Sequence, residues 1–358
     1  MKLANPDDAK ASVLPPDALV VGPRRVCLQT EKAKFECVGS PPEVISDAER
    51  LVIRPHDYIY RRDPKGRWYT SDSAVAGAFG AQADDPSGEL TWLRDASDVT
   101  PGEWSRCLLR SGLVYCWGHN ASGQLGYRSP DPNCYFMQRS MPCSSTPREV
   151  PKIRDAVQIA GEELRCARLA NGQVKCWGSI NEERTESGIH IVLCEDKKPC
   201  SPPPPRTITG MPPIRQMVVA DAGLGVDDEG NAWQWGHRAA KDNRFTAERL
   251  AEFSDVAIIR AADPATGCVL YKSGTVACWK PSSSHHFSGG QEAPEKQLAS
   301  VANLTDVVDL GTAGEMACAL RRDNSVWCWG SSAQSLCAQK AQETETPCRV
   351  LPRIAAKQ

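Results

Sequence analysis

The sequence lacks the features that would place it in a membrane or on nucleic acid. No apolar run approaches the roughly 18 residues that predict a transmembrane helix. The formal net charge is −2, from 42 Lys and Arg against 44 Asp and Glu. The chain therefore has no overall positive potential that would attract the phosphate backbone of a nucleic acid. We expect neither a membrane span nor a nucleic-acid partner.

Catalytic and cofactor signatures are missing as well. The chain has no Gly-rich phosphate loop at a strand–helix junction and no Gly-x-Ser-x-Gly elbow. It also has no His-Glu-x-x-His pair and no EF-hand loop. These absences predict no catalytic residue, no cofactor and no metal ligand, and they make an enzyme the less favoured hypothesis.

Cysteine, in contrast, is abundant, with 16 residues, and ten of these recur in one short pattern. In the clearest copy, over residues 166–178, two Cys flank an Asn-Gly turn and the second Cys precedes Trp-Gly. Apolar and polar residues alternate on both sides of the turn, which predicts a β-hairpin. Where the turn has two residues, the two Cys should lie directly opposite each other on the two strands, with Cα atoms about 4.5 Å apart. The five copies run from Cys27 to Cys37, Cys107 to Cys116, Cys166 to Cys176, Cys268 to Cys278 and Cys318 to Cys328.

Two further hairpins lack both cysteines. In one, Leu224 and Gln234 stand at the Cys positions on either side of an Asp-Glu-Gly-Asn turn. The other runs from Tyr60 through Lys65-Gly66 to Thr70. Because the two Cys are lost together, the pairs in the other copies are predicted to be bonded rather than independent thiols.

The seven hairpins recur with a period of roughly 40–50 residues, which is typical of a β-propeller. An apolar strand, most often started by Asp, precedes each hairpin, so four strands per unit are plausible. We predict an all-β fold, a seven-bladed propeller that forms one domain over residues 1–358. The strand that starts at Asp17 and the Thr346-Pro347 element should meet to close the ring. The hairpins are expected near residues 27–37, 60–70, 107–116, 166–176, 224–234, 268–278 and 318–328.

The repeat resembles that of the regulator-of-chromosome-condensation family. The resemblance rests on the Cys-turn-Cys-Trp-Gly hairpin, on Asn120-x-x-Gly-Gln-Leu-Gly126 and on the Thr146-Pro147 element. The cysteine-rich form is similar to repeats in exported bacterial proteins. The family implies a seven-bladed propeller, which agrees with the number of hairpins.

The remaining cysteines sort by proximity into three pairs, each in an insertion after a hairpin. Eight disulfides are therefore predicted, and such cross-links belong to an oxidising compartment. Zinc binding is the alternative, but it would require pairs of Cys separated by two to four residues, with four ligands brought together at each zinc ion. We expect a secreted, periplasmic or cell-surface protein. The first eight residues lack the apolar core of a signal peptide, so we expect that a leader has been removed. The three insertion pairs are Cys134 with Cys143, Cys194 with Cys200 and Cys337 with Cys348.

Tryptophan recurs at one hairpin position, directly after the second Cys or its equivalent. Recurrence in blade after blade predicts packing between blades, because ligand sites seldom repeat five times. Trp92 and Trp104 lie in irregular sequence and are the better candidates for exposed contacts. The recurring residues are Trp117, Trp177, Trp235, Trp279 and Trp329.

Candidate binding residues lie where the repeat is interrupted. His119 and His237 follow Trp-Gly at equivalent places in two blades, so they should lie near the same face. Tyr127, Tyr135 and Phe136 belong to the insertion over residues 118–148. Aromatic side chains on a cross-linked loop suit a preorganised binding surface. The alternative is that they cover the insertion's own small core.

The favoured hypothesis is an exported, non-enzymatic, monomeric propeller that binds a protein or peptide through loops on one face. An enzyme with its active site at the mouth of the central channel is the alternative, because propellers also host enzymes. Nucleotide exchange on a small GTPase, which the family resemblance implies, is a third hypothesis. The predicted disulfides and the absence of a basic patch make it the least favoured.

Overall fold

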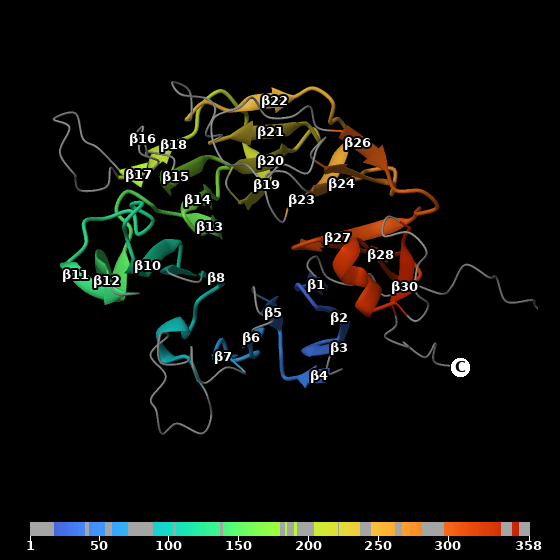
Figure 1. Cartoon of the computed structure of the whole chain (residues 1–358), viewed down its shortest axis with the longest axis horizontal. Helices are drawn as coiled ribbons and strands as arrows, with labels where there is room; N and C mark the ends of the chain where they lie inside the picture. Colours follow the sequence, from blue (N-terminus) through green and yellow to red (C-terminus); the bar gives the residue numbers. More distant parts are fainter. Residues whose placement is uncertain are drawn as a thin grey trace, which may run out of the picture.

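A computed structural model shows seven small β-sheets arranged around a central axis, with the first strand of each sheet nearest the middle (Figure 1). The predicted seven-bladed propeller is thereby confirmed. The structure describes residues 18–39, 43–53, 59–70, 89–102, 105–136, 139–179, 183–184, 190–191, 204–220, 222–236, 245–261, 267–280, 297–337 and 346–350.

Every blade is built from strands that are consecutive in the sequence, except that the short pair β16 (Glu183–Arg184) and β17 (His190–Ile191) lies between the third and fourth strands of blade 4. Blade 1 has β1 (Leu19–Val21), β2 (Arg25–Glu31), β3 (Lys34–Gly39) and β4 (Glu43–Ser46), and blade 2 has β5 (Arg50–Ile53), β6 (Ile59–Arg62) and β7 (Trp68–Thr70). Blade 3 has β8 (Asp98–Pro101), β9 (Ser105–Arg110), β10 (Leu113–His119), β12 (Arg139–Glu149) and an added outer strand, β11 (Asp131–Phe136). Blade 4 has β13 (Ala156–Gly161), β14 (Leu164–Leu169), β15 (Val174–Gly178) and β18 (Arg206–Thr207).

The later blades follow the same order. Blade 5 has β19 (Ile214–Val219), β20 (Gly223–Asp227), β21 (Ala232–Trp235) and β22 (Glu248–Leu250). Blade 6 has β23 (Val256–Ala261), β24 (Gly267–Tyr271), β25 (Val276–Lys280) and β26 (Gln297–Ser300), and blade 7 has β27 (Val307–Ala313), β28 (Met316–Arg321), β29 (Val326–Trp329) and β30 (Cys348–Val350). The short pair β16 (Glu183–Arg184) and β17 (His190–Ile191) and the 3-10 turns η4 (Thr91–Leu93) and η6 (Ser331–Ser335) lie outside the blade sheets.

Within the part of the chain that the structure describes, blades 7 and 1 meet by side-chain contacts and do not share a sheet. β1 pairs with β2 and β30 pairs with β29, so the first and last strands belong to different blades. Ala18, Leu19 and Val350 nevertheless contribute to one buried cluster between blades 7 and 1. The two ends of the described chain therefore meet as predicted, but through side chains.

Each gap between neighbouring blades is filled by one of seven buried apolar clusters. The recurring tryptophan always lies in the cluster shared with the preceding blade, so the prediction that these residues pack between blades is confirmed. Trp279, for example, packs with Leu224 and Phe253 of blade 5. A glycine across the hairpin leaves room for the tryptophan side chain. A Cβ on Gly267, directly across from Trp279, would collide with the indole.

The hairpins of neighbouring blades are joined by backbone hydrogen bonds. The turn carbonyl of Gly112 accepts a bond from Ala156 N, the first residue of the next inner strand, at 3.0 Å. Gly274 and Val307 repeat this arrangement at 3.0 Å. The residue before that strand is often Asp with φ of 54–60°, a left-handed conformation that Asp tolerates better than most residues. This geometry explains why the strand before most hairpins starts with Asp in the sequence.

Polar side chains also join one blade to the next along the inner edge. In five blades, the side chain at one equivalent position of the inner strand forms a hydrogen bond with a backbone group of the following blade. These backbone groups lie at the edge of a sheet and have no partner in a neighbouring strand. Gln158 Nε2 donates to Met217 O at 2.8 Å, and Gln216 accepts a bond from Ile259 N at 3.1 Å. We call these side chains the clasp residues; they are Arg50, Asp98, Gln158, Gln216 and Asp309.

The predicted hairpin disulfides are confirmed. In all five cysteine-bearing hairpins the two residues are directly opposed, with Cα atoms 4.0–4.1 Å apart. The structure also joins Cys134 to Cys143 and Cys337 to Cys348. Cys194 and Cys200 lie outside the described residues. Among the described helices, none is long and apolar enough to cross a membrane.

Candidate partner-binding face

The two faces of the ring differ in how much their connections vary. The turn face carries the hairpin turns, which are all short, such as residues 111–112 and 170–173. The insertion face carries the connections between the third and fourth strands of the blades that have four or more strands. These range from residues 40–42 in blade 1 to residues 179–205 in blade 4. The differences in length between blades are therefore concentrated on the insertion face.

The insertion of blade 3 begins with a compact loop over residues 120–126. Leu125 is fully buried, and Asn120 and Gln124 are 4% and 3% exposed. The Asn120 amide donates to Tyr127 O at 2.9 Å and accepts a bond from Leu125 N at 2.9 Å. The loop also lies against the next blade, because Trp177 Nε1 donates to Gln124 O at 3.0 Å. This part of the insertion is a joint between blades 3 and 4.

His119, the first predicted binding residue, ends β10 beside this loop. Its Nδ1 lies 3.1 Å from Gln124 Nε2. Desolvation by burial lowers the pKa of the half-buried imidazole below its usual value. The ring is therefore mainly neutral at pH 7 and suits a hydrogen-bonding role better than an ion pair.

Tyr127 is held by the scaffold. Its hydroxyl donates to Cys116 O at 2.5 Å, and its ring packs against the cluster between blades 3 and 4. Burial raises the pKa of the phenol to about 12, so the hydroxyl stays protonated. Tyr127 anchors the base of the insertion, and its direct contact with a partner stays a prediction.

The other predicted residues are only partly placed. The backbone of Tyr135 and Phe136 belongs to β11, which pairs with β12 and carries the bond from Cys134 to Cys143. His237 and Trp104 lie outside the described residues. Trp92, expected to be exposed, instead packs edge-on against Trp117, with ring centroids 5.9 Å apart. Its indole is therefore a support for blade 3.

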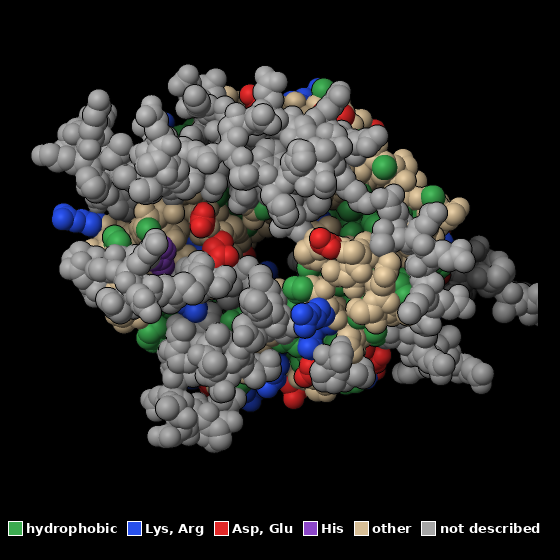
Figure 2. Space-filling view, viewed as in Figure 1, with side chains coloured by type: hydrophobic (Ala, Val, Ile, Leu, Met, Phe, Trp, Pro, Cys, Tyr) green, Lys and Arg blue, Asp and Glu red, His purple; other side chains and the backbone are tan. Residues whose placement is uncertain are grey.

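The centre of the ring is open, and charged side chains border the opening (Figure 2). On the insertion face the turns between the first and second strands supply Glu162 and Glu163 from blade 4 and Glu315 from blade 7. Arg24 and Arg25 come from the corresponding turn of blade 1, and Arg25 pairs with Glu43 at 3.3 Å. This mouth is acidic on the side of blade 4 and basic at blade 1.

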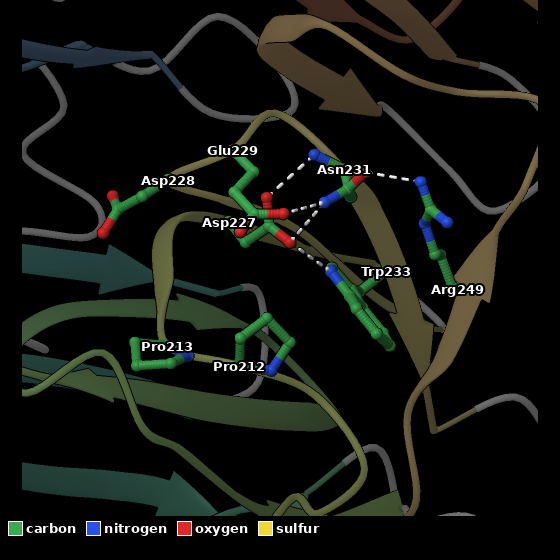
Figure 3. A pocket seen from close by; sticks show the side chains of 8 residues that line it. All are labelled: Pro212, Pro213, Asp227, Asp228, Glu229, Asn231, Trp233 and Arg249. Carbon is green, nitrogen blue, oxygen red and sulfur yellow. Dashed lines mark hydrogen bonds between the residues drawn. The ribbon is translucent and has the colours of Figure 1, made fainter.

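A pocket of about 420 Å³ lies on the turn face between blades 4 and 5 (Figure 3). Pro212 and Pro213 form one side, and Trp233 and Arg249 lie opposite. The polar groups are largely bonded to one another: Arg249 donates to Asn231 Oδ1 at 2.6 Å. Among the described residues no three His, Cys, Asp or Glu side chains are grouped to hold a metal ion.

The carboxylate of Asp227 in this pocket holds the hairpin together. Oδ1 accepts bonds from Gly230 N and Asn231 N at 2.9 and 2.8 Å, and Oδ2 accepts one from Trp233 Nε1 at 3.0 Å. Burial favours a raised pKa, but the bonds from Trp233, Asn231 and Gly230 outweigh it, and the pKa of Asp227 lies below its usual value. The group is ionised at neutral pH.

Asp63 plays the same part in blade 2. Its Oδ1 accepts bonds from Lys65 N and Arg67 N at 2.9 Å each, and Tyr69 reaches Oδ2. Blades 2 and 5 are the two whose hairpins lack the cysteine pair. The two hairpins without a disulfide thus each have a carboxylate that binds their turn residues. The signal in the sequence is an Asp six residues before an aromatic residue, and we did not recognise it from the sequence.

Comparisons with known proteins agree with this architecture. Residues 111–161 match the family model described as "Regulator of chromosome condensation (RCC1) repeat". Over 276 residues, 70% of its length, the chain is 24% identical to E3 ubiquitin-protein ligase HERC2 of Mus musculus and of Homo sapiens. That match spans only 5% of the relatives' length.

Two solved structures show the same fold. Yeast RCC1 (Prp20), in a crystal structure with Kap60, has a TM-score of 0.56 and 16% identity, covering 88% of this chain and 78% of that one. Human WBSCR16 has a TM-score of 0.51 and 17% identity, covering 93% and 81%. The chain is therefore a seven-bladed β-propeller with hairpin disulfides, and its residues 111–161 match the RCC1 repeat.

Proposed function

We propose that this protein is an exported, non-enzymatic propeller that binds a protein or peptide partner through its insertion face. The observation that carries the proposal is the contrast between the two faces. The turn face is nearly uniform from blade to blade, whereas the connections on the insertion face differ in length and composition. Binding residues in repeat folds occupy such variable connections because the repeat itself is committed to packing.

The cross-links support rigid display. The disulfide from Cys134 to Cys143 joins β12 to β11, the strand that carries Tyr135 and Phe136, and Tyr127 anchors the base of the same insertion. A loop held in one conformation loses less entropy on binding, which improves affinity without added contacts. Recognition on this face would combine such loops with the charged mouth of the channel.

Site-specific photo-crosslinking tests which face binds. A benzophenone residue placed at Tyr135 samples the insertion face, and one at the exposed Asn171 samples a hairpin turn on the other face. Both variants are exposed to secreted and envelope fractions of the source organism. We expect a discrete adduct from position 135 and none from position 171. Equal adducts, adducts only from position 171, or none from either would contradict the proposal.

Two further measurements test the remaining parts. Thiol titration of the unfolded, unreduced protein should find essentially no reactive thiols; 16 of them would contradict export to an oxidising compartment. Assay of the wild type against a broad hydrolase panel should show no turnover. Turnover that is lost on Glu162→Gln or Glu163→Gln would instead support an active site at the channel mouth.

A further inference from the structure

Three cysteines lie in one row across blade 7. Cys318 on β28 is the direct partner of Cys328 on β29, and Cys328 is in turn the direct partner of Cys348 on β30. Directly opposed residues point to the same side of a sheet. All three pack in the cluster between blades 7 and 1, which confirms that they share that side.

This row occurs in blade 7 and in none of the other cysteine-bearing blades. In each of those blades, the second cysteine of the hairpin also faces a residue on the fourth strand. That residue is Glu43 in blade 1, Arg148 in blade 3, Arg206 in blade 4 and Ala299 in blade 6. In blade 7 the residue at this position is Cys348.

The two disulfides of blade 7 differ in access. Cys318 and Cys328 are both fully buried, so an external thiol cannot reach their bond directly. Cys337 and Cys348, which form the second bond, are both partly exposed. Reduction of the blade should therefore begin at the Cys337–Cys348 bond, with attack at Cys337, because Cys348 packs against the buried cluster between blades 7 and 1.

We propose that blade 7 is a thiol–disulfide relay that carries reduction from the exposed Cys337–Cys348 bond to the buried Cys318–Cys328 bond. Its co-reactant is an external dithiol. Opposed residues of an antiparallel pair have Cα atoms about 4.5–5.5 Å apart, within the range that a disulfide spans. Cys348 and Cys328 can therefore bond once Cys348 is released.

The exchange proceeds in three balanced steps. A thiolate of the dithiol attacks Cys337 Sγ, forms a mixed disulfide and expels the Cys348 thiolate. That thiolate attacks Cys328 Sγ, forms the Cys328–Cys348 bond and expels Cys318, which takes a proton from water. The second thiol of the dithiol then attacks the mixed disulfide and releases Cys337 as a thiol. Two electrons pass from the dithiol, which becomes a cyclic disulfide, and two protein thiols result.

The relay changes which strands are cross-linked at the seam of the ring. Before exchange, the disulfide staples the β28–β29 hairpin; afterwards it joins β29 to the outer strand β30. Cys318 becomes a buried thiol among Ala18, Leu19 and Val26 of blade 1. A reductant can thus act on the interface that closes the ring without entering it.

Disulfide mapping after limited reduction tests the relay. The native protein is treated with substoichiometric dithiothreitol, quenched in acid, alkylated with N-ethylmaleimide in guanidinium chloride and mapped by mass spectrometry. We expect label on Cys318 and Cys337 and a linked Cys328–Cys348 peptide. Label on Cys337 and Cys348 with the buried bond intact, or on Cys318 and Cys328 together, would overturn the proposal. So would an unlabelled blade 7 when Cys134–Cys143 has opened.

Two controls separate relay from general reduction. In the double variant Cys337→Ala and Cys348→Ala the entry bond is gone, and we expect Cys318 to be labelled at least about tenfold more slowly. Unchanged labelling would mean direct reduction and would contradict the relay. In the same digest, blade 3 should show label on Cys134 and Cys143 only, because Arg148 and not a cysteine faces Cys116.

Discussion

The carboxylate of Asp309 accepts a hydrogen bond from Leu19 N at 3.3 Å, which joins residues 290 positions apart in the sequence. Asp309 lies on the inner strand of blade 7 and Leu19 on that of blade 1, so this bond spans the seam where the ring closes. The same carboxylate accepts a bond from Leu310 N at 2.8 Å and lies 3.8 Å from Arg260 of blade 6. One buried side chain thus connects three consecutive blades.

Replacing Asp309 with Ala should destabilise the ring. The change leaves the backbone N–H of Leu19 and the guanidinium of Arg260 without this acceptor, which costs about 1–3 kcal/mol. Thermal unfolding followed by circular dichroism measures the loss. Asp228→Ala is the control, because that side chain is exposed on a hairpin turn. Equal melting temperatures for the two variants would show that the clasp contributes nothing.

Stability at acid pH should depend on the carboxylate staple of blade 5. The pKa of Asp227 is lowered in the folded state, so its contribution is complete above the unfolded value of about 4 and is lost as pH falls through the lower folded value. Asp227→Asn should reduce stability at pH 7 and flatten its decline below about pH 4. Denaturant unfolding at a series of pH values measures both. A parallel downward shift of the whole curve would contradict the role of ionisation.

A disulfide should form in the same hairpin, in addition to that staple, when cysteines are placed at the two positions where the other blades have them. Leu224 and Gln234 are direct cross-strand partners, as the bonded pairs of the other blades are. Leu224→Cys with Gln234→Cys should oxidise and offer about 2–3 kcal/mol of chain-entropy stabilisation for a loop of this size, partly offset by the smaller core side chain. Thiol titration and melting temperature measure the two effects.

A pair that is out of register provides the control for that design. Val226 faces Ala232 and not Gln234, so Val226→Cys with Gln234→Cys should remain reduced. Oxidation of both pairs to the same extent would show that register does not govern bonding in this hairpin.

The space beneath the recurring tryptophan should be intolerant of even one methyl group. A Cβ on Gly267 would lie 2.6 Å from Arg260 O and would collide with the ring of Trp279. Gly267→Ala should cost about 1–3 kcal/mol by overpacking and should shift the fluorescence of the buried indole. Gly314→Ala meets no atom within 4 Å and tests backbone strain alone, because its φ is +52°. A smaller loss for Gly267→Ala than for Gly314→Ala would exclude the steric explanation.

Much of the fold could be predicted because its information is local. Cysteine pairs nine or ten residues apart, such as Cys107 with Cys116, reveal a hairpin and its register together. Even the divergent hairpin at Tyr60 and Thr70 has these residues directly opposed. The candidate site was predicted less well: the sequence placed Tyr127 in the insertion, but its burial and its bond to Cys116 depend on how that loop folds back.

The sequence by itself determined the number of blades and the hairpin disulfides, because alternation, turns and paired cysteines act over about ten residues. Tertiary structure alone decided which distant groups meet. It brought Asp309 to Leu19 and aligned Cys348 with Cys328. These contacts depend on the register of outer strands and on the stacking of neighbouring blades, which no local pattern in the chain encodes.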